Sequence, residues 1–531
     1  RLFPVTVSNL GGRLVLTENR LSLENVYGRY AAGTIRADGV VHRSGSRPDW
    51  DVSIEANDVR LDDALRAAAP ERLRELLEAW QVEGTLDANT MLHTAPADAA
   101  EPIAFTTSVT LNDVTVRHDL FPRPFEHVHA SIRLDPNATR AAGITARYGN
   151  ADVIASIETA FGNQNNRKTI TLKATGIELD ESIRGMLPPP YRDSWDRRAP
   201  TGSVDLSLDR LEFLADQRSN DGRWMIDGRI DMHNVGLSGA AAVSNLDGRM
   251  TIHGPLVDRD GGCAVSGSIE AARADLLNWP VREATADWVF ARLADGTGQF
   301  TISELRGTAH GGALTGGLDL RFDKARSDYT FSTTIHDVYV SAILASEEAT
   351  DGRSAVEKPT DLPKGRMDAH LYLAGDFADP TARRGGGHVE ISDGELYRLP
   401  LILAILNVFN LSVPQEEAIQ DARADFYVVG DRVAFEDILL RGNGLALAGS
   451  GEMMLPGRRV DINLISVSPH EWMRIPALTA MVEGASRNIV EVHVVGPITN
   501  PLVRARPFRG LQEELKRLFK KKAKKQRLRA S

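Results

Sequence analysis

The chain has 531 residues, of which 42% are hydrophobic and 25% are charged, and this composition excludes an intrinsically disordered protein. Its single cysteine, Cys263, excludes an intrachain disulfide framework and a cysteine metal cluster. The net charge is −10, and residues 516–531 hold nine basic residues and no acidic one, so residues 1–515 carry −19. This negative charge argues against nucleic-acid binding by residues 1–515.

Alternating apolar and polar residues recur along most of the chain and predict strands with one apolar and one polar face. Examples are the runs at 50–54, 204–208, 367–373 and 460–464. Asp-Gly between such runs is a hairpin signal, so we predict a largely antiparallel meander. We interpret as turns the Asp-Gly pairs at 38–39, 227–228, 247–248 and 393–394, and the Gly-Asp pair at 430–431.

A longer repeat lies on top of this alternation. The segments NDVRLDDAL (57–65), TGIELDESI (175–183) and HDVYVSAIL (336–344) each precede a strand that opens on a glycine. The glycine follows the third residue of each segment, Val59, Ile177 or Val338, by 25, 25 and 27 residues. We therefore predict repeated units, each a strand end, a short helix and a glycine-led strand.

Residues that could catalyse a reaction or bind a metal do not form a recognisable site pattern in the sequence. His127 and His129 fall on one face of a predicted strand, but no HExxH, CxxC or EF-hand pattern supplies a third ligand. A solvent-facing pair is the preferred interpretation. The glycines of 383–389 lack the lysine of a P-loop, and Ser450 lacks a histidine at a catalytic spacing. We predict no enzyme activity, catalytic residue, metal or cofactor.

Residues 399–414 contain no charge, and no run of about 18 apolar residues predicts a membrane-spanning helix in the chain. A helix over 401–411 would be apolar on nearly all sides, so it must be buried or face lipid. We keep both interpretations: a core helix that caps the end of a sheet, and a contact with lipid. The candidate membrane or lipid contacts are Leu401, Ile402, Ile405, Leu406, Val408, Phe409 and Leu411.

The C-terminal segment 511–531 has apolar residues at helical spacing among many lysines, as in a basic helix on an anionic membrane surface. A solvated tail is the other interpretation, and nucleic-acid binding is disfavoured by the scarcity of aromatic residues. The candidate membrane-surface residues are Lys516, Arg517, Lys520, Lys521, Lys522, Lys524 and Lys525.

The C-terminal third carries a recognisable order of elements. DGEL (393–396) precedes a proline and the apolar helix, and ADF (424–426) precedes a Gly-Asp turn. GNGLALAGSGE (442–452) and VVGPITNPLV (494–503) follow. This order resembles the C-terminal region of AsmA-like proteins, a family similar to TamB and the bridge-like lipid transfer proteins; the family commonly has Asp-Gly where Gly430 and Asp431 stand here.

The resemblance implies a long curved sheet with an apolar concave face. It also implies a periplasmic protein that guides phospholipid toward the outer membrane, anchored in the inner membrane by an N-terminal helix upstream of Arg1. The alternation is compatible with this, because acyl chains can form the layer that covers an apolar sheet face.

We therefore expect a mainly β fold: an elongated, twisted, largely antiparallel sheet curled into an apolar groove, with short peripheral helices. The expected domains are a repetitive β-groove region at 1–374, an AsmA-like region at 375–510 and a basic amphipathic tail at 511–531. The repeat-like units lie near 57–92, 175–210 and 336–373.

The expected function is non-enzymatic binding and transport of phospholipid along the groove between inner and outer membranes. The expected partners are phospholipids or other membrane lipids, the membrane surface and outer-membrane assembly proteins, with no nucleic acid. The alternative is a periplasmic scaffold or assembly factor for outer-membrane proteins, in which sheet edges pair with client strands.

Overall fold

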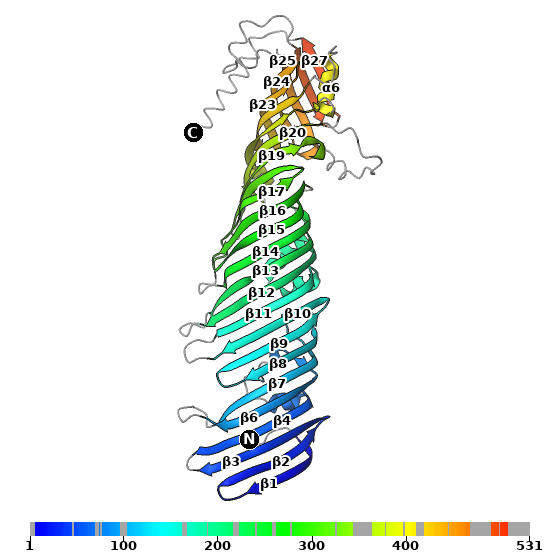
Figure 1. Ribbon diagram of the computed structural model, residues 1–531. Helices are drawn as coiled ribbons and strands as arrows, with labels where there is room; N and C mark the ends of the chain where they lie inside the picture. Colours follow the sequence, from blue (N-terminus) through cyan, green and yellow to red (C-terminus); the bar gives the residue numbers. More distant parts are fainter. Residues whose placement is uncertain are drawn as a thin grey trace. The chain divides into compact units, whose positions relative to one another are not determined.

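The fold is mainly β, as the alternation predicts: in the part of the chain that the structure describes, 27 strands form one antiparallel sheet that is accompanied by short helices (Figure 1). The computed structural model describes residues 6–44, 47–68, 74, 77–95, 103–161, 167–187, 189–215, 222–238, 242–257, 262–276, 279–323, 326–343, 364–377, 379–396, 399–409, 419–443, 445–467, 490–498 and 500–507. The chain divides into two compact units, unit 1 (1–277 and 288–295) and unit 2 (278–287 and 296–531).

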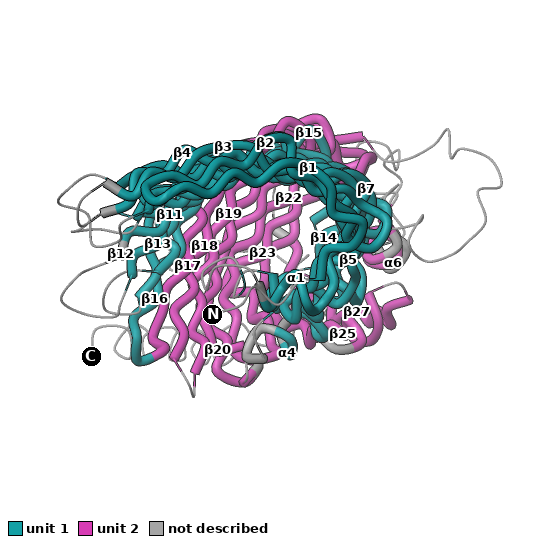
Figure 2. The backbone as a smooth tube through the Cα atoms, turned by 90° about the horizontal axis from the view of Figure 1, so that it is seen from below, with its two compact units in different colours: residues 1–277, 288–295 teal, residues 278–287, 296–531 magenta. Residues whose placement is uncertain are grey.

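The strands follow one another in chain order. The first fifteen are β1 (Ser8–Leu16), β2 (Arg20–Tyr30), β3 (Gly33–Ser44), β4 (Arg47–Arg60), β5 (Val82–Glu83), β6 (Thr85–Thr94), β7 (Ile103–Val116), β8 (Phe125–Leu134), β9 (Ala138–Tyr148), β10 (Ala151–Ala160), β11 (Arg167–Glu178), β12 (Thr201–Ala215), β13 (Gly222–Leu237), β14 (Val243–Val257) and β15 (Cys263–Leu276). The helices α1 (Asp63–Ala68), α3 (Glu181–Met186) and α4 (Pro189–Arg198) lie between strands of unit 1. Figure 2 shows unit 1, in teal, as a curved sheet.

β16 (Trp279–Arg292) contributes to both units. The remaining strands are β17 (Gly298–Ala309), β18 (Gly312–Phe322), β19 (Ser327–Tyr339), β20 (Arg366–Asp376), β21 (Arg384–Ser392), β22 (Asp421–Val429), β23 (Arg432–Arg441), β24 (Ala446–Met454), β25 (Arg459–Val467), β26 (Val490–Pro497) and β27 (Leu502–Pro507). Unit 2 also holds α6 (Pro400–Phe409) and the 3-10 turns η1 (Pro380–Ala382) and η4 (Pro456–Arg458).

Most strands pair antiparallel with their neighbours in the chain, which makes the sheet a meander. For example, Thr90 of β6 pairs with Thr107 of β7, and Ile157 of β10 pairs with Ile170 of β11. The two-residue strand β5 departs from this order, because it pairs with β7 and leaves β4 to pair with β6.

A β-bulge interrupts many of the strand pairs, and in several of them the bulge residue has a positive φ. Asp58, Gly176 and Asp337 have φ values of 54°, 75° and 58°, and the register shifts beside each. Asparagine, aspartate and glycine tolerate this conformation better than other residues. A bulge bends its strand and increases the local twist, so bulges in successive strands curl the sheet.

Three of the Asp-Gly pairs that we interpreted as hairpin turns lie inside strands, so that interpretation is wrong for residues 38–39, 227–228 and 247–248. The glycines serve close backbone packing. A Cβ at Gly39, Gly228 or Gly248 would lie 2.2, 2.5 or 2.4 Å from a carbonyl oxygen of the neighbouring strand. The Gly-Asp pair at 430–431 does form a hairpin turn, between β22 and β23.

The three sequence repeats share a backbone hydrogen bond between the end of the first strand and the glycine that opens the next. The amides of Leu61, Leu179 and Val340 donate to the carbonyls of Gly84, Gly202 and Gly365 at 3.1, 3.0 and 3.1 Å. Short helices follow in the first two units, α1 and α3, and residues 340–343 are helical in the third. The repeat predicted from these segments therefore corresponds to a repeated structure.

An aspartate three residues after each of these glycines holds the bulge of the neighbouring strand. The amides of the bulge residues Asp58, Gly176 and Asp337 each donate to its carboxylate at 2.8 Å. We call this contact the bulge lock; the three lock residues are Asp87, Asp205 and Asp368. Two more locks join Asn25 to Asp38 at 2.5 Å and Asn234 to Asp247 at 2.6 Å. The Asp-Gly pairs at 38–39 and 247–248, which lie inside strands and are not turns, therefore each contain a lock residue.

The lock at Asp205 is expected to make the sheet sensitive to acid. The hydrogen bond from the Gly176 amide is the main cause that lowers the pKa of this carboxyl, with a smaller contribution from His233 and with burial opposing both. A carboxyl whose pKa is lower in the folded state stabilises that state above its unfolded pKa of about 3.9. This stabilisation is lost as the pH falls through the folded-state pKa.

We therefore expect Asp205→Ala to weaken hydrogen-exchange protection of the β11 and β12 amides by about 1 kcal/mol at pH 7 and to flatten its dependence on pH below about 5. Asp205→Asn is the matched control, because its amide oxygen still accepts from Gly176 but does not titrate. It should lose less protection and show the same flattening. Unchanged protection in Asp205→Ala would contradict a role for the lock.

Candidate functional site

The apolar face of unit 1 lines a long groove with a volume of about 2730 Å³. Apart from Val7, which precedes β1, its lining residues come from β3 to β13, from α1 and α3, and from the connections beside them. Most of these side chains are aliphatic or aromatic, and we call this cavity the unit 1 groove. All of its lining residues belong to one compact unit.

A continuous row of apolar side chains runs across the strands along the bottom of the groove. Each member pairs in register with the next on the neighbouring strand. We call this set the floor row; its members are Ile35, Ala56, Ala88, Val109, Ile132, Ala141, Ile157, Ile170 and Leu211. The opposite face of the same strands carries charged pairs, such as Arg140 and Glu158 with 2.8 Å between Nε and Oε1. The period of two in the sequence thus separates an apolar face from a polar one.

Helices and a loop close one long edge of the groove. Leu65 of α1, with Leu77 and Trp80 after it, packs against the buried residues of β7 and β8. Farther along, Ile183 and Met186 of α3 line the groove. We call this side the helix edge, and its residues add to the apolar lining rather than offering polar groups.

The segment 117–124 belongs to the helix edge and packs against α3. A Cβ at Gly185 would lie 2.6 Å from Cγ of Pro122, so glycine permits a close approach. Arg123 Nη2 lies 2.8 Å from Asp180 Oδ2, which joins this segment to the start of α3. Aromatic rings continue the wall: Phe125 lies between Phe121 and Tyr148, with ring centroids 4.9 and 5.0 Å away.

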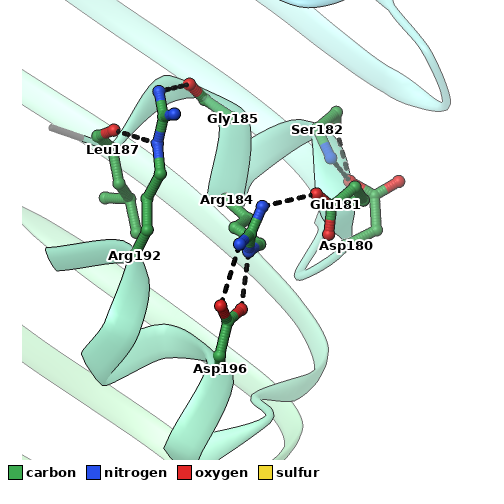
Figure 3. Close-up of polar contacts among 8 residues, drawn as sticks. All are labelled: Asp180, Glu181, Ser182, Arg184, Gly185, Leu187, Arg192 and Asp196. Carbon is green, nitrogen blue, oxygen red and sulfur yellow. Dashed lines mark hydrogen bonds and ion pairs between the residues drawn. The ribbon is translucent and has the colours of Figure 1, made fainter. Parts of the chain in front are cut away.

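A compact set of polar contacts fixes α3 to α4 (Figure 3). Asp180 caps α3 by accepting a hydrogen bond from the Ser182 amide at 2.9 Å. Arg184 donates from Nε and Nη2 to the two carboxylate oxygens of Asp196 at 2.5 and 2.8 Å, and from Nη1 to Glu181 at 2.8 Å. Arg192 donates to the carbonyls of Leu187 and Gly185 at 2.9 and 3.0 Å (Figure 3). These contacts hold the short helix α3 in place at the groove wall.

The opposite long edge, formed by hairpin ends, is more polar, and we call it the hairpin edge. A second cross-strand row lies two residues farther along each strand than the floor row, toward this edge. We call it the rim row; its members are Thr90, Thr107, Leu134, Thr139, Thr159 and Lys168. The hydroxyls of Thr90 and Thr107 lie 3.1 Å apart. His93, Asp135 and Asn137 also line the groove near this edge.

The predicted lipid-contact residues of α6 belong to unit 2 and are not among the lining residues of the unit 1 groove. Ile402, Ile405 and Leu406 are buried with strand residues such as Leu464 and Val492. Leu401 is partly buried against the same cluster. This burial favours the core-helix interpretation for these side chains, while contact of α6 with lipid stays a prediction. Among the described residues, no helix is long and apolar enough to span a membrane.

Several other predicted contacts lie outside the described residues. They are the side chains of Val408 and Phe409, all of Leu411, and the basic residues Lys516, Arg517, Lys520, Lys521, Lys522, Lys524 and Lys525. The predicted division of the chain into domains at 1–374, 375–510 and 511–531 also stays a prediction. The two compact units follow a different partition, with β16 shared between them.

The remaining chemical candidates are placed on strands. His127 and His129 are both exposed, as the solvent-facing interpretation predicts, and His127 Nδ1 lies 2.8 Å from Asp113 Oδ1. The glycine run at 383–389 forms most of β21, and Ser450 lies within β24. In the part of the chain that the structure describes, no three His, Cys, Asp or Glu side chains are grouped to hold a metal ion.

Comparisons with protein families, with curated proteins and with solved structures find no match for this chain. The resemblance of the C-terminal third to AsmA-like proteins therefore stays a prediction from its sequence motifs.

The residues that line the groove are not among the site residues predicted from the sequence. The signal was present in the alternation, but each bulge changes which residues face inward. In β9, for example, Thr139 and Ala141 are followed across the bulge at Gly143 by Ile144 and Ala146 as lining residues. An uninterrupted odd-numbered series would have placed the last two on the wrong face.

Proposed function

We propose that this protein is not an enzyme and that it binds lipids by their acyl chains in the unit 1 groove. The observation that carries the proposal is the floor row, an unbroken series of apolar side chains across nine strands. A surface of this kind releases ordered water when an acyl chain covers it. It offers a polar substrate no hydrogen-bonding partners along its length.

The size of the groove supports a long ligand or several ligands in line. Its volume of about 2730 Å³ exceeds the roughly 300–1,000 Å³ of an ordinary small-molecule pocket. An antiparallel sheet with one apolar face also needs a second layer against that face. In unit 1, helices cover one edge of the groove, and we propose that acyl chains cover the floor.

We propose further that the bound lipid is phospholipid in transit between two membranes. The resemblance of residues 375–507 to AsmA-like proteins supports this step, and with it a periplasmic location between inner and outer membranes. The membrane surface would then be a partner at each end of the route, and transfer would require only apolar contact along the sheet.

Lipid extraction and vesicle transfer test the proposal. We expect the chain, purified without detergent, to contain phospholipid that organic extraction and mass spectrometry detect. We also expect it to speed the movement of a fluorescent phospholipid from donor to acceptor vesicles. A chain that carries no lipid after incubation with vesicles and transfers none would refute the function.

A scaffold for outer-membrane proteins is the second candidate, and the sheet edges favour it. Among the described residues, β1 pairs only with β2, and β27 pairs only with β26. Unpaired strand edges can accept a strand from another protein. Photo-crosslinkers placed at residue 14 of β1 and residue 157 of the floor row separate the candidates. Protein adducts at 14 without lipid adducts at 157 would favour the scaffold.

A further inference from the structure

Lys168 is the only lysine or arginine among the described residues that line the unit 1 groove. It lies on β11 on the same face as Ile170 and Leu172, which are also lining residues. No described carboxylate lies within ion-pair distance of its ammonium group. A lysine in such a place lays its apolar stem along the wall and keeps its charge toward water or an anion.

The neighbours of Lys168 have the chemistry of a membrane interface. In register, Lys168 pairs with Thr159 of β10 on one side and with Phe213 of β12 on the other. Thr159 in turn pairs with Thr139, and the rings of Phe213 and Trp224 have centroids 5.0 Å apart. Tryptophan is enriched at the headgroup level of membranes because its ring has an apolar body and one polar atom, and lysine places its ammonium group at the same level.

Polarity therefore changes across the width of the groove. The floor row beside this site, at Ile157 and Ile170, is wholly apolar, while the rim row two residues outward along the strands holds hydroxyls and one ammonium group. On the same edge, the carboxylate of Asp135 accepts hydrogen bonds from the amides of Asn137 and Ala138 at 2.9 Å, so it closes its own turn.

We infer that the unit 1 groove binds the phosphate of a lipid headgroup at Lys168, with the headgroup at the hairpin edge and the acyl chains over the floor row. This inference rests on the proposed lipid function and adds the ligand class and its orientation. In this complex the ammonium group donates to the phosphate oxygens, and Thr159 and Thr139, which follow Lys168 in the rim row, supply further hydroxyl donors. Lipids without a phosphate would keep the acyl contact but lose this one.

A competition between two lipids with the same acyl chains tests the inference. The purified full chain is incubated with vesicles that contain equal amounts of phosphatidylglycerol and diacylglycerol, and the bound lipids are then extracted and quantified by mass spectrometry. We expect the wild-type chain to enrich phosphatidylglycerol. Lys168→Met should lower the ratio of bound phosphatidylglycerol to diacylglycerol about tenfold, since a hydrogen bond to a charged group is lost.

Two variants make the result specific. Lys173→Met removes the same charge from the exposed face of the same strand and should keep the wild-type ratio. Lys168→Arg should keep most of the preference because it retains a cation. An unchanged ratio in Lys168→Met, or an equal loss of both lipids, would overturn the inference and leave the proposed function standing. Absence of both lipids from the wild-type chain would instead overturn the proposed function.

Discussion

Replacing Ile157 with aspartate should reduce lipid binding by at least about tenfold and slow vesicle-to-vesicle transfer to a similar degree. Ile157 is the seventh of the nine floor-row residues, paired with Ala141 and Ile170. An ionised carboxylate there would lose its water whenever an acyl chain covered it, and the neighbouring side chains offer it no hydrogen bonds. The amount of phospholipid extracted per chain measures the effect directly.

Ile154→Asp is the matched control, because Ile154 lies on the same strand and faces the other side. Its side chain is 54% exposed, so the carboxylate remains in water whether or not lipid is bound. This variant should bind and transfer lipid as the wild type does. Circular dichroism should show the same strand content for both variants. Equal lipid content in the two would show that the floor row does not hold acyl chains.

Replacing Ile405 with aspartate should destabilise unit 2 by more than about 4 kcal/mol. Ile405 is 2% exposed in α6 and belongs to a core that also contains Leu447, Leu464 and Val494. The aspartate would place a carboxylate among side chains that cannot pair with it. Hydrogen exchange of the β24 to β26 amides measures the loss of stability in this unit without requiring the whole chain to unfold together.

Ile405→Val is the control for packing alone, and it should cost about 1 kcal/mol because it removes one methylene group. A stable Ile405→Asp protein that no longer binds vesicles would contradict the core role. It would show instead that α6 leaves the sheet and enters a lipid leaflet. The two outcomes therefore separate the two interpretations of the apolar stretch at 399–414.

The strand content could be predicted from the sequence, because period-two alternation depends on nothing beyond the chain's own pattern. The antiparallel order could be predicted only from the turns, and of these the Gly-Asp pair at 430–431 is a hairpin turn whereas three Asp-Gly pairs lie inside strands. The repeat could be predicted as well, since its glycines and aspartates recur at nearly fixed spacing. The bulge lock could not be recognised, because its two halves lie 13 to 31 residues apart. Asp38 and Asp247 therefore have the local signature of a turn but accept a hydrogen bond from the preceding strand.

Only the apolar character of the candidate site could be predicted from the sequence. Alternation indicates an apolar sheet face, but it does not give the register that aligns Val109 with Ile132 or places Lys168 beside Thr159. The apolar helix is predicted as a lipid contact because it is the least polar segment. Three of its side chains, Ile402, Ile405 and Leu406, are instead buried in the core of unit 2. The groove instead takes its lining from many weakly hydrophobic strands, none of which stands out alone.

The bulge locks also bear on how such a groove can vary in length. Each lock joins a bulge to a strand close to it in the sheet, so the bend of a strand is decided by residues beside it rather than by the two ends of the sheet. Adding or deleting one pair of strands would then change the length and volume of the groove without altering the cross-section of the remaining part. Chains built on this plan can therefore differ in groove length through the number of their strands alone.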